Sequence, residues 1–239
     1  MKTFLFVALY QPLLNALVLL YSYIPGHDFG VAVIVLTALL RLALYPLGVS
    51  TAITQKKMAL IQPKIREIQE RLKHNKDEQA RALFSLYKQE RVNPFLNILP
   101  VLAQIPIMIT LYQIFLRGID VSNLHGLYSF VSKPEIINTM FLGVVDLRER
   151  SFVIALLAGV MQFAQTKQLS SQTPKPQNPS DTASMIQKQM MFFLPILTIS
   201  VVSGLPSVVG LYWVVSSVLA IAQQWHIASM IKKAYPTHI

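Results

Sequence analysis

The stretch FGVAVIVLTALLRLALYPLGVSTAIT, residues 29–54, carries one charged side chain, Arg41, in an otherwise apolar run. A helix needs about 20 predominantly apolar residues to cross roughly 30 Å of hydrocarbon. A membrane span that begins near Phe29 therefore places Arg41 close to its middle, where a charge costs at least ~2.5–3.5 kcal/mol. The next charges, Lys56 and Lys57, are roughly 22 Å further along a helix that rises ~1.5 Å per residue. An arginine side chain does not reach that far, so groups close to Arg41 must solvate it.

Two interpretations of Arg41 remain open. In the first, Pro46 and Gly48 end the helix early and the side chain extends to the membrane interface. In the second, which we favour, Arg41 is a functional residue that water reaches inside the membrane.

The composition of the chain is that of an integral membrane protein. Of its 239 residues, 53% are hydrophobic and 13% are charged, whereas a soluble domain averages about 25% charged residues. The absence of cysteine excludes disulfides, thiol catalysis and thiolate metal sites. The five histidines occur singly, and no glycine belongs to a phosphate-binding GxxxxGK(S/T) pattern. We therefore expect no catalytic residue, no metal, no cofactor and no enzymatic activity.

Hydropathy and charge together predict five membrane spans, at residues 29–50, 95–117, 151–168, 186–203 and 206–226. Fifteen of the 21 Lys and Arg residues fall in segments 55–92, 167–188 and 232–233, which the positive-inside rule places in the cytoplasm. Region 118–150 has nearly equal numbers of acidic and basic residues and is predicted to be extracytoplasmic. The predicted fold is an all-α membrane protein, a five-transmembrane-helix bundle with its N terminus outside and its C terminus in the cytoplasm.

Residues 1–28 are predicted to form an amphipathic helix that lies in the outer interface. Pro12 removes a backbone donor in mid-helix, and Gln11 and Asn15 lie four residues apart on one face. The alternative is a sixth span over residues 3–24, which is also consistent with the topology.

Residues 55–92 form the one long polar segment, between the first span (29–54) and the four further spans (93–230). Apolar residues recur at helical spacing on both sides of the break HNKD, which predicts two antiparallel helices, a polar cytoplasmic helical hairpin. Its apolar seam is formed by Ile61, Ile65, Ile68, Leu72, Leu83, Leu86 and Tyr87. Asn75 or Asp77 caps the second helix. We expect this hairpin to be more mobile than the bundle.

The remaining connections are predicted to be irregular. Segment 169–184 is rich in Pro, Ser, Gln and Asn and is predicted to be a flexible cytoplasmic loop. The fourth and fifth spans are joined by SGLPS in a tight hairpin, and residues 231–239 form a short cytoplasmic tail. We expect region 118–150 and SGLPS to cap the outer end of the bundle and to leave no aqueous path through it.

Four patches of the sequence occur in the order found in one family. They are LRLALYPL (40–47), IQPKIREIQERL (61–72), YKQERVNPFLNILPVLAQIPIMITLY (87–112) and LPSVVGLYWVVSSVLAIAQQ (205–224). Together they closely resemble the YidC/Oxa family of membrane protein insertases over residues 8–230. The chain is similar to a short bacterial form, since it shows no large extracytoplasmic domain and no lipoprotein cysteine.

The resemblance implies five spans around a hydrophilic groove that opens to the cytoplasm and to lipid. It assigns the groove arginine to Arg41 and a position facing the same cavity to Thr37. The other substrate-binding positions that it implies are Trp213, Tyr212, Gln162 and Gln104. Judged from the residues alone, Thr37 is more often bonded to its own backbone, and Tyr212 and Trp213 suit an aromatic belt equally well.

The function implied by the resemblance is that of an insertase and chaperone of the bacterial cytoplasmic membrane, acting as a monomer without nucleotide hydrolysis. Its implied partners are nascent membrane proteins, the lipid bilayer, the ribosome with its RNA, and the Sec translocon. The short tail IKKAYPTHI weakens the expectation of strong ribosome tethering. Two alternatives are a small anion channel or transporter, and a structural assembly factor. No Asp or Glu lies in any predicted span, which disfavours proton-coupled transport.

The most specific expectation concerns the surroundings of Arg41. Its side chain should lie in a cavity between helices, near Gln162 and Trp213, with no carboxylate partner. Unpaired burial is tolerable only where water reaches the charge, because an isolated desolvated ion costs far more than a helix can supply.

Overall fold

The computed structural model describes residues 6–117, 124, 126–172 and 182–234 and is mostly helical. The elements in chain order are η1 (Phe6–Tyr10), α2 (Gln11–Tyr23), α3 (Phe29–Ala43), α4 (Tyr45–Arg71), α5 (Lys76–Gln89), η2 (Pro94–Asn97), α6 (Leu99–Arg117), β1 (Met140–Phe141), β2 (Val145–Asp146), α7 (Phe152–Gln172), α8 (Thr182–Ser203) and α9 (Ser207–Ala234). The prediction of a helical protein is confirmed. It did not include the antiparallel ribbon of β1 and β2, which has two residues in each strand.

Four helical stretches of the described chain are long and apolar enough to cross a membrane: Phe6–Tyr23, Pro94–Leu116, Phe152–Ser170 and Ser207–Ile231. The bent pair of α3 and α4 makes a fifth if it counts as one span. Within α8, the apolar part among the described residues is the shorter Met191–Ser203. The protein thus has several candidate spans, as predicted. Phe6–Tyr23 passes the same test, so its assignment to the interface stays a prediction.

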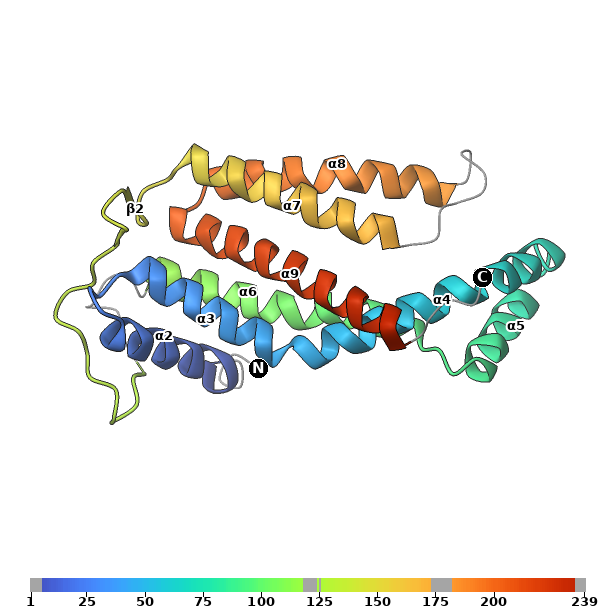
Figure 1. Cartoon of the computed structure of the whole chain (residues 1–239), viewed down its shortest axis with the longest axis horizontal. Coiled ribbons are helices and arrows are strands. Elements are labelled where there is room, and N and C mark those ends of the chain that lie inside the picture. The colour runs from blue at the N-terminus through green and yellow to red at the C-terminus, as the bar shows by residue number, and fades with distance from the viewer. Residues whose placement is uncertain (1–5, 118–123, 125, 173–181, 235–239) are drawn as a thin grey trace.

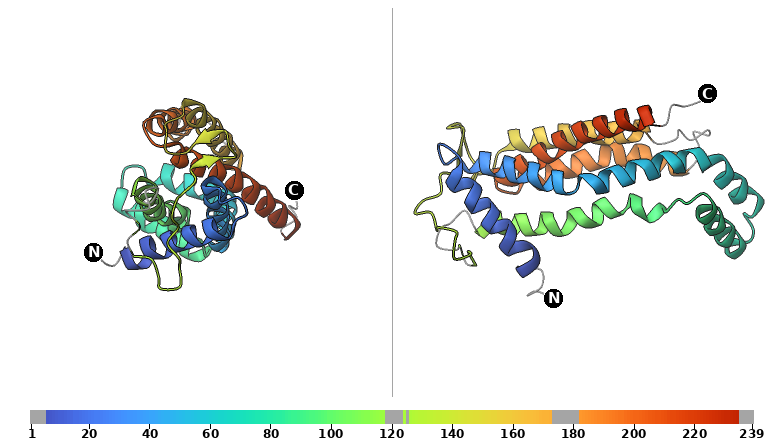
Figure 2. Two further views of the ribbon diagram at one scale, coloured as in Figure 1. Left: turned by 90° about the vertical axis from the view of Figure 1, so that its left-hand side faces the viewer. Right: turned by 60° about the horizontal axis from the view of Figure 1, so that its bottom comes forward.

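The helices run roughly along one long axis in layers (Figure 1). α7 and α8 lie side by side, α9 packs between this pair and α3, and α2 covers α3 from the other side (Figures 1 and 2). Although only residues 204–206 connect α8 to α9, α8 packs chiefly against α7. Gly159 of α7 permits this close approach, since a Cβ there would meet the side chain of Ile199.

The predicted first span is divided in two at Leu44. α3 ends at Ala43, α4 begins at Tyr45, and the two helices are bent by 52°. Pro46 in the first turn of α4 explains the break, because proline has no N–H to bond the preceding turn and is favoured at helix starts. α4 then continues to Arg71 without interruption. α4 therefore joins the predicted first span (29–54) and the predicted polar hairpin (55–92) in one continuous helix.

α5 folds back beside the end of α4 (Figure 1). The two helices share a small core of buried Ile61, Ile65, Leu86 and Val92, surrounded by Met58, Ile68, Leu83 and Tyr87. This core contains six of the seven predicted seam residues, and Leu72 lies outside it as the C-cap of α4. Asn75 Oδ1 accepts a hydrogen bond from the backbone N–H of Glu78 at 3.2 Å and caps α5.

Segment 169–184 is partly helical, which differs from the predicted loop. α7 continues through Gln172, and α8 begins at Thr182. The rest of the predicted loop lies outside the described residues.

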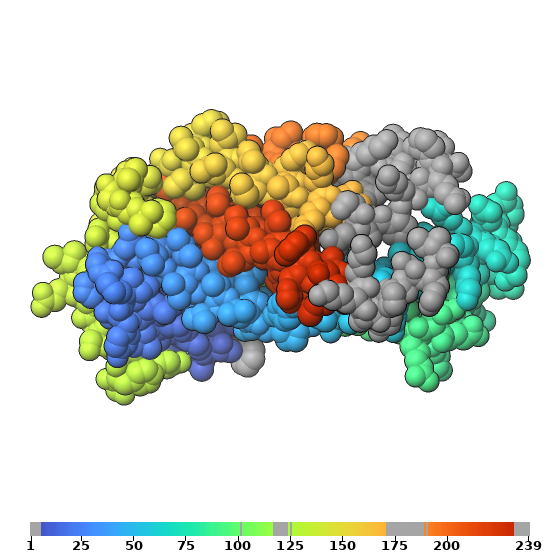
Figure 3. Space-filling view, in the orientation of Figure 1, coloured from blue at the N-terminus to red at the C-terminus, as the bar shows by residue number. Residues whose placement is uncertain are grey.

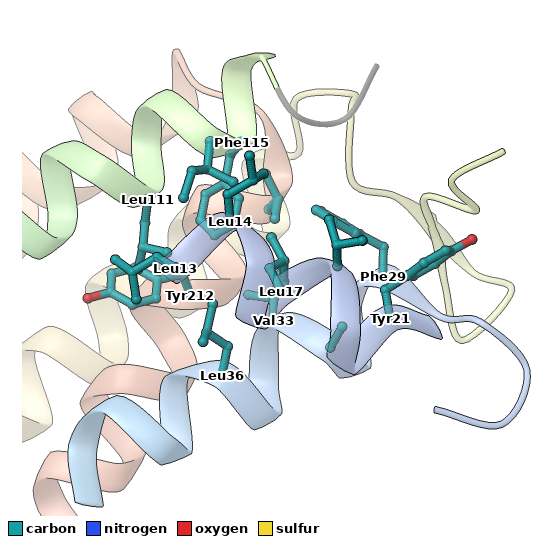
Figure 4. Close-up of a cluster of buried hydrophobic side chains, with 14 of the residues drawn as sticks. Leu13, Leu14, Leu17, Tyr21, Phe29, Val33, Leu36, Leu111, Phe115 and Tyr212 are labelled. Carbon is teal, nitrogen blue, oxygen red and sulfur yellow. The ribbon is translucent and has the colours of Figure 1, made fainter. Parts of the chain in front are cut away.

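Buried apolar side chains pack together in the main hydrophobic core (Figure 4). It joins apolar side chains of α2, α3, α6 and α9, among them Leu14, Leu17, Val33, Leu111 and Phe115, all at most 2% exposed. We call the end of the bundle beyond this core the loop end, because residues 126–150 lie there; the opposite end, at α5, is the hairpin end (Figure 1).

Hydrogen bonds attach residues 126–150 to the helices at the loop end. Asn15 of α2 donates to the carbonyl of Gly126 at 3.1 Å and accepts from the N–H of Tyr128 at 2.7 Å. Asp28 caps α3 by accepting from Val31 N–H and also accepts from Leu142 N–H at 2.7 Å.

The start of α9 is held to the same segment. The backbone N–H of Ser207 donates to Glu149 O at 2.9 Å, and that of Val208 donates to Leu147 O at 3.1 Å. The bonds from α2, α3 and α9 together fix this part of the loop segment to the bundle.

Candidate functional site

Arg41 lies in the last turn of α3 and is half-buried between helices. Its Nη2 donates a hydrogen bond to Ser216 Oγ of α9 at 2.5 Å. The side chain lines two adjoining cavities, of about 240 Å³ and about 140 Å³, and is the one charged group among the described residues of either lining. No described carboxylate lines them, so a neutral hydroxyl holds the guanidinium and its charge stays available to a ligand.

The smaller cavity lies between α6, α7 and α9. Besides Arg41, it is lined by Gln104, Met108, Gln162, Gln165, Tyr212, Trp213, Ser216 and Ser217. The indole Nε1 of Trp213 donates to Gln162 Oε1 at 3.0 Å, and Gln104 Nε2 donates to the hydroxyl of Tyr212. These bonds orient the polar side chains around the guanidinium.

The larger cavity extends from Arg41 toward the hairpin end. α4, η2, α6, α7 and α9 all contribute to its wall, with the polar side chains of Thr51, Gln55, Asn97, Gln104, Gln165, Gln223 and Gln224. A volume of about 240 Å³ is several times the ~30 Å³ share of one water molecule in the liquid. The cavity is therefore large enough for solvent or a segment of polypeptide.

Toward the loop end, apolar packing closes the smaller cavity. Tyr212 is 5% exposed, and its ring lies 6.5 Å from that of Phe115, which also packs against Phe29. Figure 4 shows Tyr212 at the edge of the main core, beside Leu111. The polar half of the bundle thus gives way to an apolar half within about one helical turn of Arg41.

The structure brings five of the six predicted site residues to the smaller cavity and leaves one outside. Arg41, Gln104, Gln162, Tyr212 and Trp213 line it. Thr37 lines neither cavity; it is 2% exposed, and its hydroxyl donates to Val33 O at 2.6 Å. Thr37 adopts the bond to its own backbone that such residues commonly form inside helices.

Sequence reasoning missed several polar residues that line the cavities. Ser216 and Ser217 follow Trp213 by three and four residues, and Gln165 follows Gln162 by three. Such spacing places them on the same helix face as the predicted residues. This periodicity in otherwise apolar spans is the signal that would have identified them.

Comparison with known proteins decides the family. The profile of the 60Kd inner membrane protein family matches residues 19–234. The chain belongs to this family, the YidC/Oxa family. The resemblance that the sequence motifs indicated is thereby confirmed.

Three relatives are each called membrane protein insertase YidC. The protein of Geobacter metallireducens is 31% identical over 96% of this chain and 38% of its own length. That of Geotalea uraniireducens is 33% identical over 93% of this chain and 38% of its own length. That of Francisella tularensis subsp. novicida is 30% identical over 83% of this chain and 32% of its own length. The chain therefore spans less than two fifths of the length of these relatives.

All the residues that line the two cavities fall inside the part of this YidC/Oxa chain that the family profile matches. The linings run from Arg41 to Ile227, within residues 19–234. The candidate site is accordingly located in the region that defines the family.

Proposed function

We propose that this protein is a membrane protein insertase of the bacterial cytoplasmic membrane that integrates small or single-span proteins and assists their folding. Membership of the YidC/Oxa family and the names of its relatives support the activity. The observation that carries the mechanism is Arg41, a positive charge held by a hydroxyl beside two cavities that are lined in part by polar side chains.

The two cavities form a groove that receives the polar tail of a substrate. An acidic tail is attracted to Arg41, and at an effective dielectric constant of ~20 two unit charges ~4 Å apart attract by roughly 4 kcal/mol. No carboxylate of the protein competes for the guanidinium among the described residues of the linings. The barrier to moving the tail into the membrane falls by part of this energy.

The apolar segment of the substrate leaves the groove between α6 and α8. These helices have no extensive contact with one another, and both expose large apolar side chains: Leu102, Ile105 and Ile109 on α6, and Phe192, Phe193 and Ile196 on α8. Burial of the substrate helix in lipid, at about 25 cal/mol per Å² of apolar surface, drives this step. No nucleotide hydrolysis is needed.

In this proposal the α4–α5 pair faces the cytoplasm and the ribosome, with its RNA. The Sec translocon is a further partner, within the membrane. The N terminus is outside, and the protein acts as a monomer. The positive charge of segment 55–92 supports this orientation.

Insertion of a single-span protein with an acidic tail into liposomes that contain only this chain tests the proposal. Arg41→Ala should reduce the insertion rate about tenfold or more, since loss of ~1.4 kcal/mol suffices for tenfold. Arg41→Lys should retain much of the rate, because transient attraction needs a charge more than a bidentate fork. Substrates with neutral tails should respond less to either change.

Arg71→Ala is the matched control. Arg71 is exposed at the end of α4 and lines neither cavity, so the variant removes the same charge without touching the groove. Equal insertion of acidic tails by Arg41→Ala and wild type would refute the electrostatic role. Anion flux through the liposomes, with no insertion, would favour a channel, and neither activity would favour an assembly factor.

A further inference from the structure

Amide side chains from five different elements line the larger cavity. They are Gln55 of α4, Asn97 of η2, Gln104 of α6, Gln165 of α7, and Gln223 and Gln224 of α9. We call this set the amide cluster. Each amide offers both hydrogen-bond donors and an acceptor, and none carries a charge that would select particular side chains.

Two acceptors of the amide cluster are buried and unused. Oδ1 of Asn97 and Oε1 of Gln224 have no hydrogen-bond donor among the described residues. Buried polar atoms in native proteins are nearly always paired, so an unpaired one calls for an explanation such as a ligand. Both residues line the cavity, and because the two oxygen atoms are themselves enclosed, a rotation of each amide side chain brings its acceptor to a donor in the cavity.

Close packing between α4 and α9 positions one member of the amide cluster, Gln223. Gly48 of α4 faces Gln223 of α9, and a Cβ on residue 48 would meet the Nε2 atom of that amide. Glycine at this position therefore lets the amide of Gln223 lie close against α4, at the wall of the cavity.

We infer that the amide cluster is a binding subsite for the unpaired backbone of an extended polypeptide tail. This inference rests on the proposed function and specifies how the groove accepts tails of different sequence. A polypeptide that leaves water must satisfy its backbone N–H and C=O groups. The amides supply peptide-like partners for any sequence, while Arg41 adds a preference for acidic residues.

The test compares two neutral tails in which the glycine nitrogens carry either a hydrogen or a methyl group. One alternates glycine and serine, and the other replaces each glycine with N-methylglycine. The wild-type chain in liposomes should insert the first about tenfold faster, as expected for one or two lost hydrogen bonds. The double variant Asn97→Leu with Gln224→Leu should remove this advantage.

Gln113→Leu is the matched control, since Gln113 of α6 is exposed and lines neither cavity; it should keep the advantage in full. Gly48→Ala leaves every amide present but displaces that of Gln223, and should reduce the advantage even if the double variant does not fold.

Equal insertion of both tails by the wild-type chain would overturn the inference. So would an equal loss for both tails in the double variant, which would show that the amides only hydrate the cavity. Failure of the proposed function has a different signature: the wild-type chain would insert neither these tails nor an acidic one.

Discussion

Ser216 holds the guanidinium of Arg41 with a neutral hydroxyl, at a distance of 2.5 Å. A carboxylate in this place would neutralise the charge and compete with an acidic ligand, whereas a hydroxyl orients the side chain and leaves the charge uncompensated. Ser216 therefore fixes the position of the Arg41 side chain without neutralising the charge that would bind an acidic ligand.

Replacement of Ser216 separates the position of the side chain from its charge. In Ser216→Ala the charge remains but loses its partner, and hydrogen bonds to charged groups contribute about 1.5–3 kcal/mol. We expect slower insertion of acidic-tailed substrates, with a smaller loss than in Arg41→Ala. Ser217→Ala is the control, because Ser217 lines the same cavity and has no bond to Arg41. Equal effects of both serine variants in the liposome assay would refute the positioning role.

At the scale of elements, α5 depends on its N-terminal cap. Asn75 accepts the N–H of Glu78, and the core beneath α5 contains few buried residues. Asn75→Ala should destabilise α5 locally by about 1 kcal/mol, which raises its amide exchange rate roughly fivefold while exchange in α9 stays unchanged. Asn75→Ser should restore protection. Unchanged exchange in Asn75→Ala would show that packing alone holds α5.

The packing of α7 on α8 is equally testable. In Gly159→Ala the new methyl group meets Ile199, and Pro195 O at 3.2 Å. Overpacking costs about 1–3 kcal/mol, which exceeds the ~1 kcal/mol that alanine gains as a better helix former. The melting temperature in detergent should fall, whereas Gly204→Ala should leave it unchanged because only Val201 O lies near, at 3.5 Å. A Gly159→Ala variant as stable as wild type would contradict this close packing.

Local patterns in the sequence predicted the elements better than their junctions. The seam from Ile61 to Tyr87 follows helical periodicity, which is a property of each helix alone, and six of its seven residues lie in the observed core. The bend at Leu44 depends on how Pro46 is accommodated, since proline can end, kink or begin a helix. The pairing of α8 with α7 depends on the contact of Gly159 with Ile199, which no single helix reveals.

In the candidate site, too, features that depend on one helix were predictable, whereas features that depend on the packing of several helices were not. Arg41 was identifiable because a charge in an apolar span is costly wherever its partners lie. Thr37, one turn away on α3, faces packed side chains, and only the rotation of α3 against its neighbours distinguishes the two positions. Ser216 and Gln165 carry no charge and stand out only by their spacing from Trp213 and Gln162.

The molecule as a whole has two unlike halves. Near the loop end, buried apolar side chains fill the space between α2, α3, α6 and α9; toward the hairpin end, polar side chains line the cavities. In the space-filling view, α9 fills the surface between α7 and α3 (Figure 3). In the proposed mechanism, water therefore enters the groove from the hairpin end only.

The absence of native cysteine makes this asymmetry directly measurable. In proteoliposomes of defined orientation, Gln165→Cys, at a partly exposed position that lines both cavities, should react with a membrane-impermeant maleimide added on the side of the hairpin end and should resist it on the other side. Phe130→Cys, in the loop segment where Phe130 is 71% exposed, should show the opposite pattern. Labelling of Gln165→Cys from both sides would indicate a continuous pore and would refute the one-sided groove.

From the bend at Leu44, α4 extends as one long helix to α5. Its 27 residues extend about 40 Å at ~1.5 Å per residue, so a tilt of about 5° around the bend moves the far end by roughly 3.5 Å. The pivot lies three residues after Arg41, and no loop separates it from the arm that carries α5. A small change in the angle between α3 and α4 would therefore displace α5 by several ångströms while Arg41, beside the bend, stays nearly in place.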